Sequence, residues 1–180
     1  MAMVRAAEVV GVAANLLYTW MYLKGMVPEA YLGAALGSVA LMWACSKRGL
    51  LAESGLHLFY LLMAGFGAWV ATSWTPWGSV SWVWHVGSIA LGCLAWGALV
   101  PVLKARGSSL PVVDGFTTVF SILATWWMIQ FDALNWWYWL VIDLVSVWLY
   151  AKRGMPWGAL LFAVYSLMAL DGCFEAIEWF

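Results

Sequence analysis

Seven apolar stretches follow one another along the chain, separated by short polar breaks. They cover approximately residues 8–24, 30–46, 51–72, 80–103, 110–130, 134–151 and 156–178. The breaks contain turn-forming and charged residues, among them Lys24-Gly25, Lys47-Arg48-Gly49 and Lys152-Arg153-Gly154. Backbone groups in lipid must be bonded within their own segment, so each stretch is expected to be a helix. The pattern predicts an all-α membrane protein with seven transmembrane helices.

Composition supports the same fold class. Of the 180 residues, 66% are hydrophobic and only 9% are charged, whereas soluble domains carry roughly 25% charged residues. Seven spans of about 20 residues leave no room for a separate soluble domain. The net charge is −1, and no basic stretch exceeds two residues, so a nucleic-acid partner is not expected. The expected surroundings of the chain are a lipid bilayer.

The basic residues predict the orientation of the chain in the membrane. With seven spans, one side of the membrane receives only Lys24. The other side receives all the remaining basic residues, namely Arg5, Lys47, Arg48, Lys104, Arg106, Lys152 and Arg153. Because Lys and Arg are retained in cytoplasmic loops, we expect the N-terminus inside and the C-terminus outside.

The chain also contains an internal repeat. When it is shifted by 105 positions, ten of the twenty-five residues at 43–67 are identical to their counterparts. The identical pairs are Trp43/Trp148, Lys47/Lys152, Arg48/Arg153, Gly49/Gly154, Leu56/Leu161, Tyr60/Tyr165, Leu62/Leu167, Met63/Met168, Ala64/Ala169 and Gly67/Gly172. A shift of 106 aligns the first stretch with the fifth and matches Glu8 with Asp114 and Thr19 with Thr125.

Four spans separate equivalent helices, so both copies insert the same way round. We therefore predict a 3+1+3 parallel repeat, an arrangement typical of transporters. Its parts are a first three-helix repeat at 1–72, a connector helix at 80–103 and a second three-helix repeat at 110–180.

The sixth stretch carries the clearest candidate site. Six residues fall on one face at helical spacing: Asn135, Trp136, Trp139, Asp143, Ser146 and Tyr150. A carboxylate in mid-span is costly, so Asp143 should face the bundle interior or water. Indole faces beside a carboxylate favour a flat, cationic ligand. Two alternatives remain open: Trp136 as an interfacial anchor, and Asp143 as the structural partner of a Ser or Tyr.

Small polar side chains form stripes in the first and fifth stretches. Asn15 lies in the first, and Ser121 and Thr125 lie in the fifth. These stripes predict either a hydrated path that lines the substrate site or hydrogen bonds between helices. Tyr60 and Tyr165 are related by the repeat and are candidates for the substrate site, a gate or core packing.

Acidic residues near helix ends are candidates for a gate or an outer mouth. Asp171 and Glu175 share one face of the last stretch and approach its outer end, where they would attract a cation. The alternative is a solvated helix end. Asp114 lies near the inner end of the fifth stretch, where it belongs to a gate or pairs with a nearby Lys or Arg.

An enzyme, a metal centre or a cofactor site is not expected. His57 and His85 differ in depth by about ten residues, roughly 15 Å along a helix, which is too far apart to ligate one haem. Cys45, Cys93 and Cys173 show no metal-binding spacing. Three classes of function remain: a transporter for a small cationic molecule, a sugar transporter, and a structural membrane protein with no substrate path.

Three segments resemble one known family. They are Pro111 to Ser121 with Asp114, Thr117 and Thr118; Asn135-Trp136-Trp137-Tyr138-Trp139 followed by Asp143; and Leu149-Tyr150-Ala151-Lys152-Arg153-Gly154. They are similar to the opening of helix 5, the W-x-x-W-x-x-x-D helix and the LY-x-K-G helix end of the PnuC-type vitamin transporters. The resemblance extends over nearly the whole chain, although Thr125 stands where the family usually has Gln.

The resemblance implies a seven-helix transporter with the architecture of the SWEET sugar transporters in the opposite topology. It further implies a homotrimer in the bacterial cell inner membrane. Members usually take up nicotinamide riboside, and relatives take thiamine or riboflavin. Transport is by facilitated diffusion, and cytosolic phosphorylation traps the substrate. Trp136 and Trp139 occupy the W-x-x-W positions. We expect a cationic vitamin precursor, with nicotinamide riboside first, thiamine second and riboflavin as a further alternative.

Overall fold

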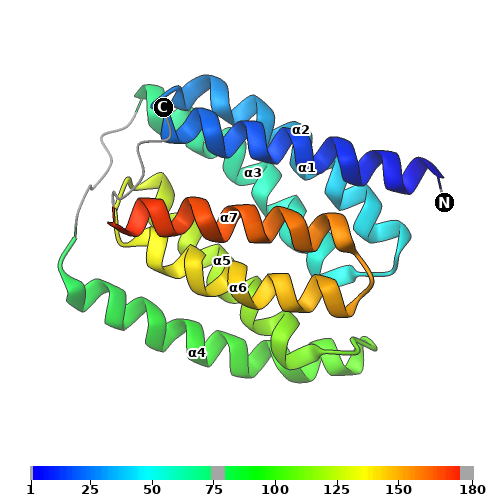
Figure 1. Ribbon diagram of the computed structural model, residues 1–180. Helices are drawn as coiled ribbons and strands as arrows, with labels where there is room; N and C mark the ends of the chain where they lie inside the picture. The colour runs from blue at the N-terminus through cyan, green and yellow to red at the C-terminus, as the bar shows by residue number, and fades with distance from the viewer. Residues whose placement is uncertain (1, 74–79, 175–180) are drawn as a thin grey trace. The chain divides into compact units, whose positions relative to one another are not determined.

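The computed structural model describes residues 2–73 and 80–174, which form seven helices and no strand (Figure 1). The helices are α1 (Ala2–Leu23), α2 (Val27–Lys47), α3 (Leu51–Ser73), α4 (Trp82–Ala105), α5 (Pro111–Ile129), α6 (Asn135–Lys152) and α7 (Pro156–Phe174). The predicted all-α class is therefore confirmed. α1 and α2 begin earlier than their apolar stretches, because polar residues and a proline are well tolerated in the first turns of a helix.

Five helices are long and apolar enough to cross a membrane: α2, α3, α4, α5 and α7. By that measure α1 and α6 are less apolar than the sequence pattern suggested. In α6 the reason is its content of tryptophan and tyrosine, together with Asn135 and Asp143. The lower apolarity of α6 thus comes in part from the same residues that make it the candidate site.

The chain divides into two compact units, Met1–Pro76 and Trp77–Phe180. In the first unit, α2 packs against both α1 and α3. Tyr31, Ala34 and Ala64 form its buried core. Close approach of α1 to α2 depends on a small residue, because a β carbon at Gly37 would collide with the Asn15 side chain.

In the second unit, α5 packs against α4 and α6, and α6 packs against α7. Its core consists of Phe120, Ala124 and Ile142. Among the candidate spans α5 is the most buried and α4 the least, with 61% and 6% of their apolar windows inside the fold. The buried residues of α5 include Asp114, Thr117, Ser121 and Thr125, whereas α4 presents most of its apolar side chains outward.

The same contacts recur in both units at positions related by the sequence repeat. Arg48 binds Glu8 at 2.6 Å, and Arg153 binds Asp114 at 2.7 Å. Each ion pair joins the start of one helix to the end of the next, α1 to α2 and α5 to α6. Each unit also has a lysine over an indole, Lys47 over Trp43 and Lys152 over Trp148.

The turns between helices correspond in the same way. Gly49 (φ 74°) and Gly154 (φ 65°) follow α2 and α6. Gly25 (φ 71°) follows α1, and Phe131 (φ 57°) holds the equivalent position after α5. This left-handed conformation suits glycine and is uncommon for a bulky residue, so the second unit maintains a strained turn where the first has an unstrained one.

Candidate functional site

The polar face of α6, defined by Asn135, Trp136, Trp139, Asp143, Ser146 and Tyr150, points into the protein. Asn135 is 3% exposed, and Asp143 and Ser146 are each 2% exposed. The opposite face of the helix carries exposed apolar residues, including Val141 and Leu144. The helical spacing that singled out this face from the sequence therefore corresponds to its burial in the structure.

Three buried polar atoms on this face have no hydrogen-bond partner within the described residues. They are Asn135 Oδ1, Trp139 Nε1 and Asp143 Oδ1, spaced one helical turn apart over a rise of about 12 Å. Buried polar groups are nearly always hydrogen-bonded, because leaving one unsatisfied costs about 1–3 kcal/mol. A row of three unsatisfied groups therefore indicates a place where a polar ligand or water binds.

The two indoles of the polar face are held by neighbouring helices. Trp136 lies directly over Gly172 of α7, where a β carbon would collide with the ring. Trp139 packs against the core residues Phe120, Ala124 and Ile142. Both rings are thus fixed before a ligand arrives, which lowers the entropy cost of stacking a flat ligand on them.

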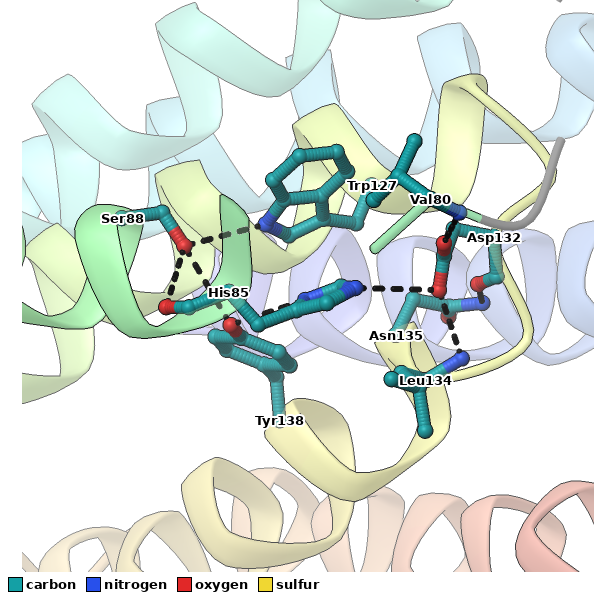
Figure 2. A network of polar contacts seen from close by, with 8 residues as sticks. All are labelled: Val80, His85, Ser88, Trp127, Asp132, Leu134, Asn135 and Tyr138. Carbon is teal, nitrogen blue, oxygen red and sulfur yellow. Dashed lines mark hydrogen bonds and ion pairs between the residues drawn. The ribbon is translucent and has the colours of Figure 1, made fainter. Parts of the chain in front are cut away.

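The start of α6 is held by the buried carboxylate of Asp132, 1% exposed (Figure 2). Asp132 Oδ1 accepts a hydrogen bond from Leu134 N–H at 2.8 Å, and Asp132 Oδ2 accepts one from Val80 N–H at 2.8 Å. The backbone carbonyl of Asp132 accepts a bond from Asn135 Nδ2 at 2.6 Å. This last bond fixes the orientation of the Asn135 amide, whose oxygen has no hydrogen-bond partner within the described residues.

His85 of α4 joins this network. Its Nε2 lies 3.5 Å from Asp132 Oδ1, and its Nδ1 lies 3.1 Å from Tyr138 Oη. The Tyr138 hydroxyl and Trp127 Nε1 each lie 3.3 Å from Ser88 Oγ. The imidazole also packs on the Trp127 ring, with ring centroids 4.6 Å apart. One histidine thereby links α4, α5 and α6.

The four remaining polar and tyrosine candidates of the second unit differ in their contacts. The Thr125 hydroxyl donates to its own helix at Ser121 O, 2.7 Å away, and both residues are buried. The Tyr150 ring packs against Gly158 and lies 4.9 Å from the Phe162 ring, centroid to centroid. The Tyr165 ring lies 6.2 Å from that same phenylalanine. A role of these four residues in a substrate site stays a prediction.

The candidates of the first unit contact their own helices. Asn15 Nδ2 donates to Gly11 O at 2.9 Å. Tyr60 packs edge-on against His57, with ring centroids 5.8 Å apart. Both contacts fit helix packing, and a place for these residues in a substrate site stays a prediction.

The acidic candidates differ in their surroundings. Asp114 is 2% exposed, accepts two bonds of 2.7 Å from Arg153 and accepts a third from Ser108 at 2.5 Å. This is the pairing with a basic residue that the sequence left open. Asp171 is buried at 7% exposure, unlike a solvated helix end. Glu175 lies outside the described residues.

Sequence reasoning missed Asp132, His85 and Tyr138 as parts of this site. Asp132 lies in the break between the fifth and sixth stretches, and His85 was considered only as a possible haem ligand. The available signal was a histidine and an aspartate near the predicted outer ends of neighbouring helices. Nothing in their spacing shows contact, since His85 and Tyr138 are 53 residues apart.

Comparisons with known proteins identify the family. Residues 5–180 match the family model described as nicotinamide mononucleotide transporter. A solved structure, "Crystal structure of the Vitamin B3 transporter PnuC", is similar, with a TM-score of 0.69 and 18% identity, over 96% of this chain and 80% of that one. At that identity the likeness shows a shared fold. No curated protein matched the sequence significantly. Because the family model matches nearly the whole chain, the protein belongs to the nicotinamide mononucleotide (PnuC-type) transporter family.

Proposed function

We propose that this membrane transporter takes up nicotinamide riboside, and that the polar face of α6 binds it. The observation that carries the proposal is the row of three unpartnered buried atoms, Asn135 Oδ1, Trp139 Nε1 and Asp143 Oδ1, beside the two fixed indoles. The row is about 12 Å long, which suits a flat base joined to a sugar. The structural relative is a vitamin B3 transporter, which agrees with this substrate.

The chemistry of the face matches a cationic nucleoside. Trp136 and Trp139 offer ring faces for stacking and cation–π attraction to a pyridinium ring. Asp143 offers negative charge to that cation, and Asn135 Oδ1 and Trp139 Nε1 offer one acceptor and one donor to hydroxyl or amide groups.

The same face argues for the nucleoside over the nucleotide. None of its six residues is basic, whereas binding of a phosphate is favoured by Arg or Lys. Of the two basic residues that follow the face, Lys152 lies over the Trp148 ring and Arg153 is engaged by Asp114. A phosphate placed beside Asp143 would meet a like charge, so the mononucleotide should bind much more weakly.

The proposed mechanism is uniport. A monocation gains about 2.3 kcal/mol per 100 mV of membrane potential, so inward movement needs no coupled ion. Phosphorylation in the cytosol would then trap the product, as the resemblance to the family implies. No catalytic step, metal or cofactor of the transporter itself is part of this proposal.

We further propose a 3+1+3 parallel repeat with SWEET-like architecture, the N-terminus inside and the C-terminus outside. The matched ion pairs Glu8–Arg48 and Asp114–Arg153 support the repeat. We place the protein in the bacterial inner membrane as a homotrimer. The outward apolar surface of α4 supports burial in lipid or against another subunit.

The other candidates complete the proposal. Ser121, Thr125, Tyr150, Tyr165, Asn15 and Tyr60 would line the substrate path, and Asp171 and Glu175 would lie at its outer mouth. Asp114 is assigned to the inner-end ion pair, where it would hold α5 to α6.

Calorimetric titration of the purified transporter with four ligands tests this proposal. Nicotinamide riboside should bind tightest, thiamine more weakly, and the mononucleotide and riboflavin weakest. Tight thiamine binding with weak riboside binding would reassign the substrate within the family. Tight binding of riboflavin alone, or equal binding of riboside and mononucleotide, would contradict a site selective for a cationic nucleoside.

A further inference from the structure

We propose that His85 and Asp132 are positioning residues for the substrate, acting through the Asn135 amide. The inference rests on the proposed function, in which Asn135 contacts the ligand. It assigns a role to residues that lie outside the polar face of α6 and belong to the outer-end network shown in Figure 2.

Asp132 is the central member of this network. Its carboxylate accepts hydrogen bonds from Val80 N–H and Leu134 N–H, each at 2.8 Å, and lies 3.5 Å from His85 Nε2. These partners come from the segment before α4, from the start of α6 and from α4 itself. With both carboxylate oxygens engaged and 1% of the residue exposed, Asp132 is restrained from several directions.

The restraint on Asp132 is transmitted to Asn135 by two bonds. Asp132 O accepts Asn135 Nδ2 at 2.6 Å and Asn135 N at 3.1 Å. An amide held by its nitrogen cannot exchange the places of its nitrogen and oxygen without losing that bond. The acceptor oxygen is therefore presented to the ligand, and a shift of Asp132 would release it.

His85 is itself held in place. Tyr138 Oη lies 3.1 Å from Nδ1, and the imidazole packs on Trp127. If the tyrosine hydroxyl donates to Nδ1, the ring proton lies on Nε2 and faces the Asp132 carboxylate. At 3.5 Å this contact is longer than a normal N–H···O bond, so it acts chiefly as an electrostatic attraction.

The first unit lacks this arrangement, and it also lacks the candidate ligand-binding residues. Met26 stands at the position equivalent to Asp132, Ala30 at that of Asn135, Ala34 at that of Trp139 and Ser38 at that of Asp143. The turn before α2 has Gly25 in the left-handed conformation, whereas the equivalent turn before α6 has Phe131 in that conformation. The network and the strained turn therefore occur together with the polar face they would position.

A double-mutant cycle on riboside binding tests the inference. Asn135→Ala should weaken binding about tenfold, the value of one lost hydrogen bond of roughly 1.4 kcal/mol. His85→Phe keeps an aromatic ring on Trp127 but removes both nitrogens, and should weaken binding roughly three- to tenfold. In the Asn135→Ala background, His85→Phe should have almost no further effect, because both changes act through one amide.

Controls separate the possible failures. His57→Phe alters the other buried histidine, which lies in the first unit beside Tyr60, and any effect on affinity should add in full to that of Asn135→Ala. His85→Gln retains a donor and should partly restore binding. If His85→Phe does not fold, Asp132→Asn replaces it in the same cycle. Additive effects of His85→Phe and Asn135→Ala, or no effect of His85→Phe, would overturn the inference. An Asn135→Ala variant with normal affinity would instead remove Asn135 from the proposed site.

Discussion

At the scale of single residues, Asp143 is the most telling group in the protein. It is 2% exposed, and its Oδ1 has no hydrogen-bond partner within the described residues. A carboxylate buried within a membrane protein is expensive, and such residues usually serve transport. Asp143→Asn should therefore weaken binding of cationic riboside tenfold or more, while binding of a neutral analogue of the same shape changes less than threefold. Calorimetric titration with both ligands measures the two effects.

Ser146→Ala provides the matched control for this prediction. Ser146 lies on the same face of α6 and is equally buried at 2% exposure, but it carries no charge. Its substitution should leave the ratio of cation to neutral affinity unchanged. If Asp143→Asn reduces thermal stability but binds and transports the cation normally, the carboxylate is a structural partner.

At the scale of elements, the contact of α6 with α7 sets the position of an indole. Gly172 of α7 lies so close to Trp136 that a β carbon would meet the ring. Gly172→Ala should therefore displace the ring and reduce riboside affinity about tenfold, since stacking on an aromatic ring is worth roughly 1–3 kcal/mol per base. Quenching of tryptophan fluorescence by the ligand should decrease in parallel.

The internal repeat supplies the control for this element. Gly67 of α3 stands in the same relation to Tyr31 of α2, and a β carbon there would collide with the tyrosine ring. Gly67→Ala should reduce the melting temperature in detergent to a similar extent, with little effect on affinity. If both variants lose affinity equally, the loss comes from general destabilisation rather than from displacement of the Trp136 ring.

Elements were more predictable from the sequence than the contacts between them. Each of the seven helices follows from one apolar stretch, because the hydrophobic period and the glycine-containing breaks are local signals. The buried face of α6 likewise follows from spacing within one helix. The contacts of Asp132 with His85 and of Asp114 with Arg153 depend on how helices pack, and local sequence carries no such information. The left-handed conformation of Phe131 could not be predicted from the sequence, because only the folded chain imposes it.

At the scale of the whole molecule, basic residues lie at equivalent helix ends in the two units. In each unit one arginine is used in an ion pair, Arg48 with Glu8 and Arg153 with Asp114. The adjacent lysines lie over indoles, Lys47 over Trp43 and Lys152 over Trp148. Lysine and arginine near the ends of spans are retained on the cytoplasmic side, so these ends of both repeats should face the cytoplasm.

Reporter insertions test this topology and the number of spans together. We expect a phosphatase that is active only outside the inner membrane to be inactive after Gly107 and active after Gly25 and at the C-terminus. Three helices, α5, α6 and α7, separate Gly107 from the C-terminus. If the less apolar α6 did not cross, the C-terminal reporter would remain inside and inactive. If α1 did not cross, a reporter after Gly25 would lie on the same side as the N-terminus. A fluorescent reporter that matures only in the cytoplasm should give the opposite pattern at each position.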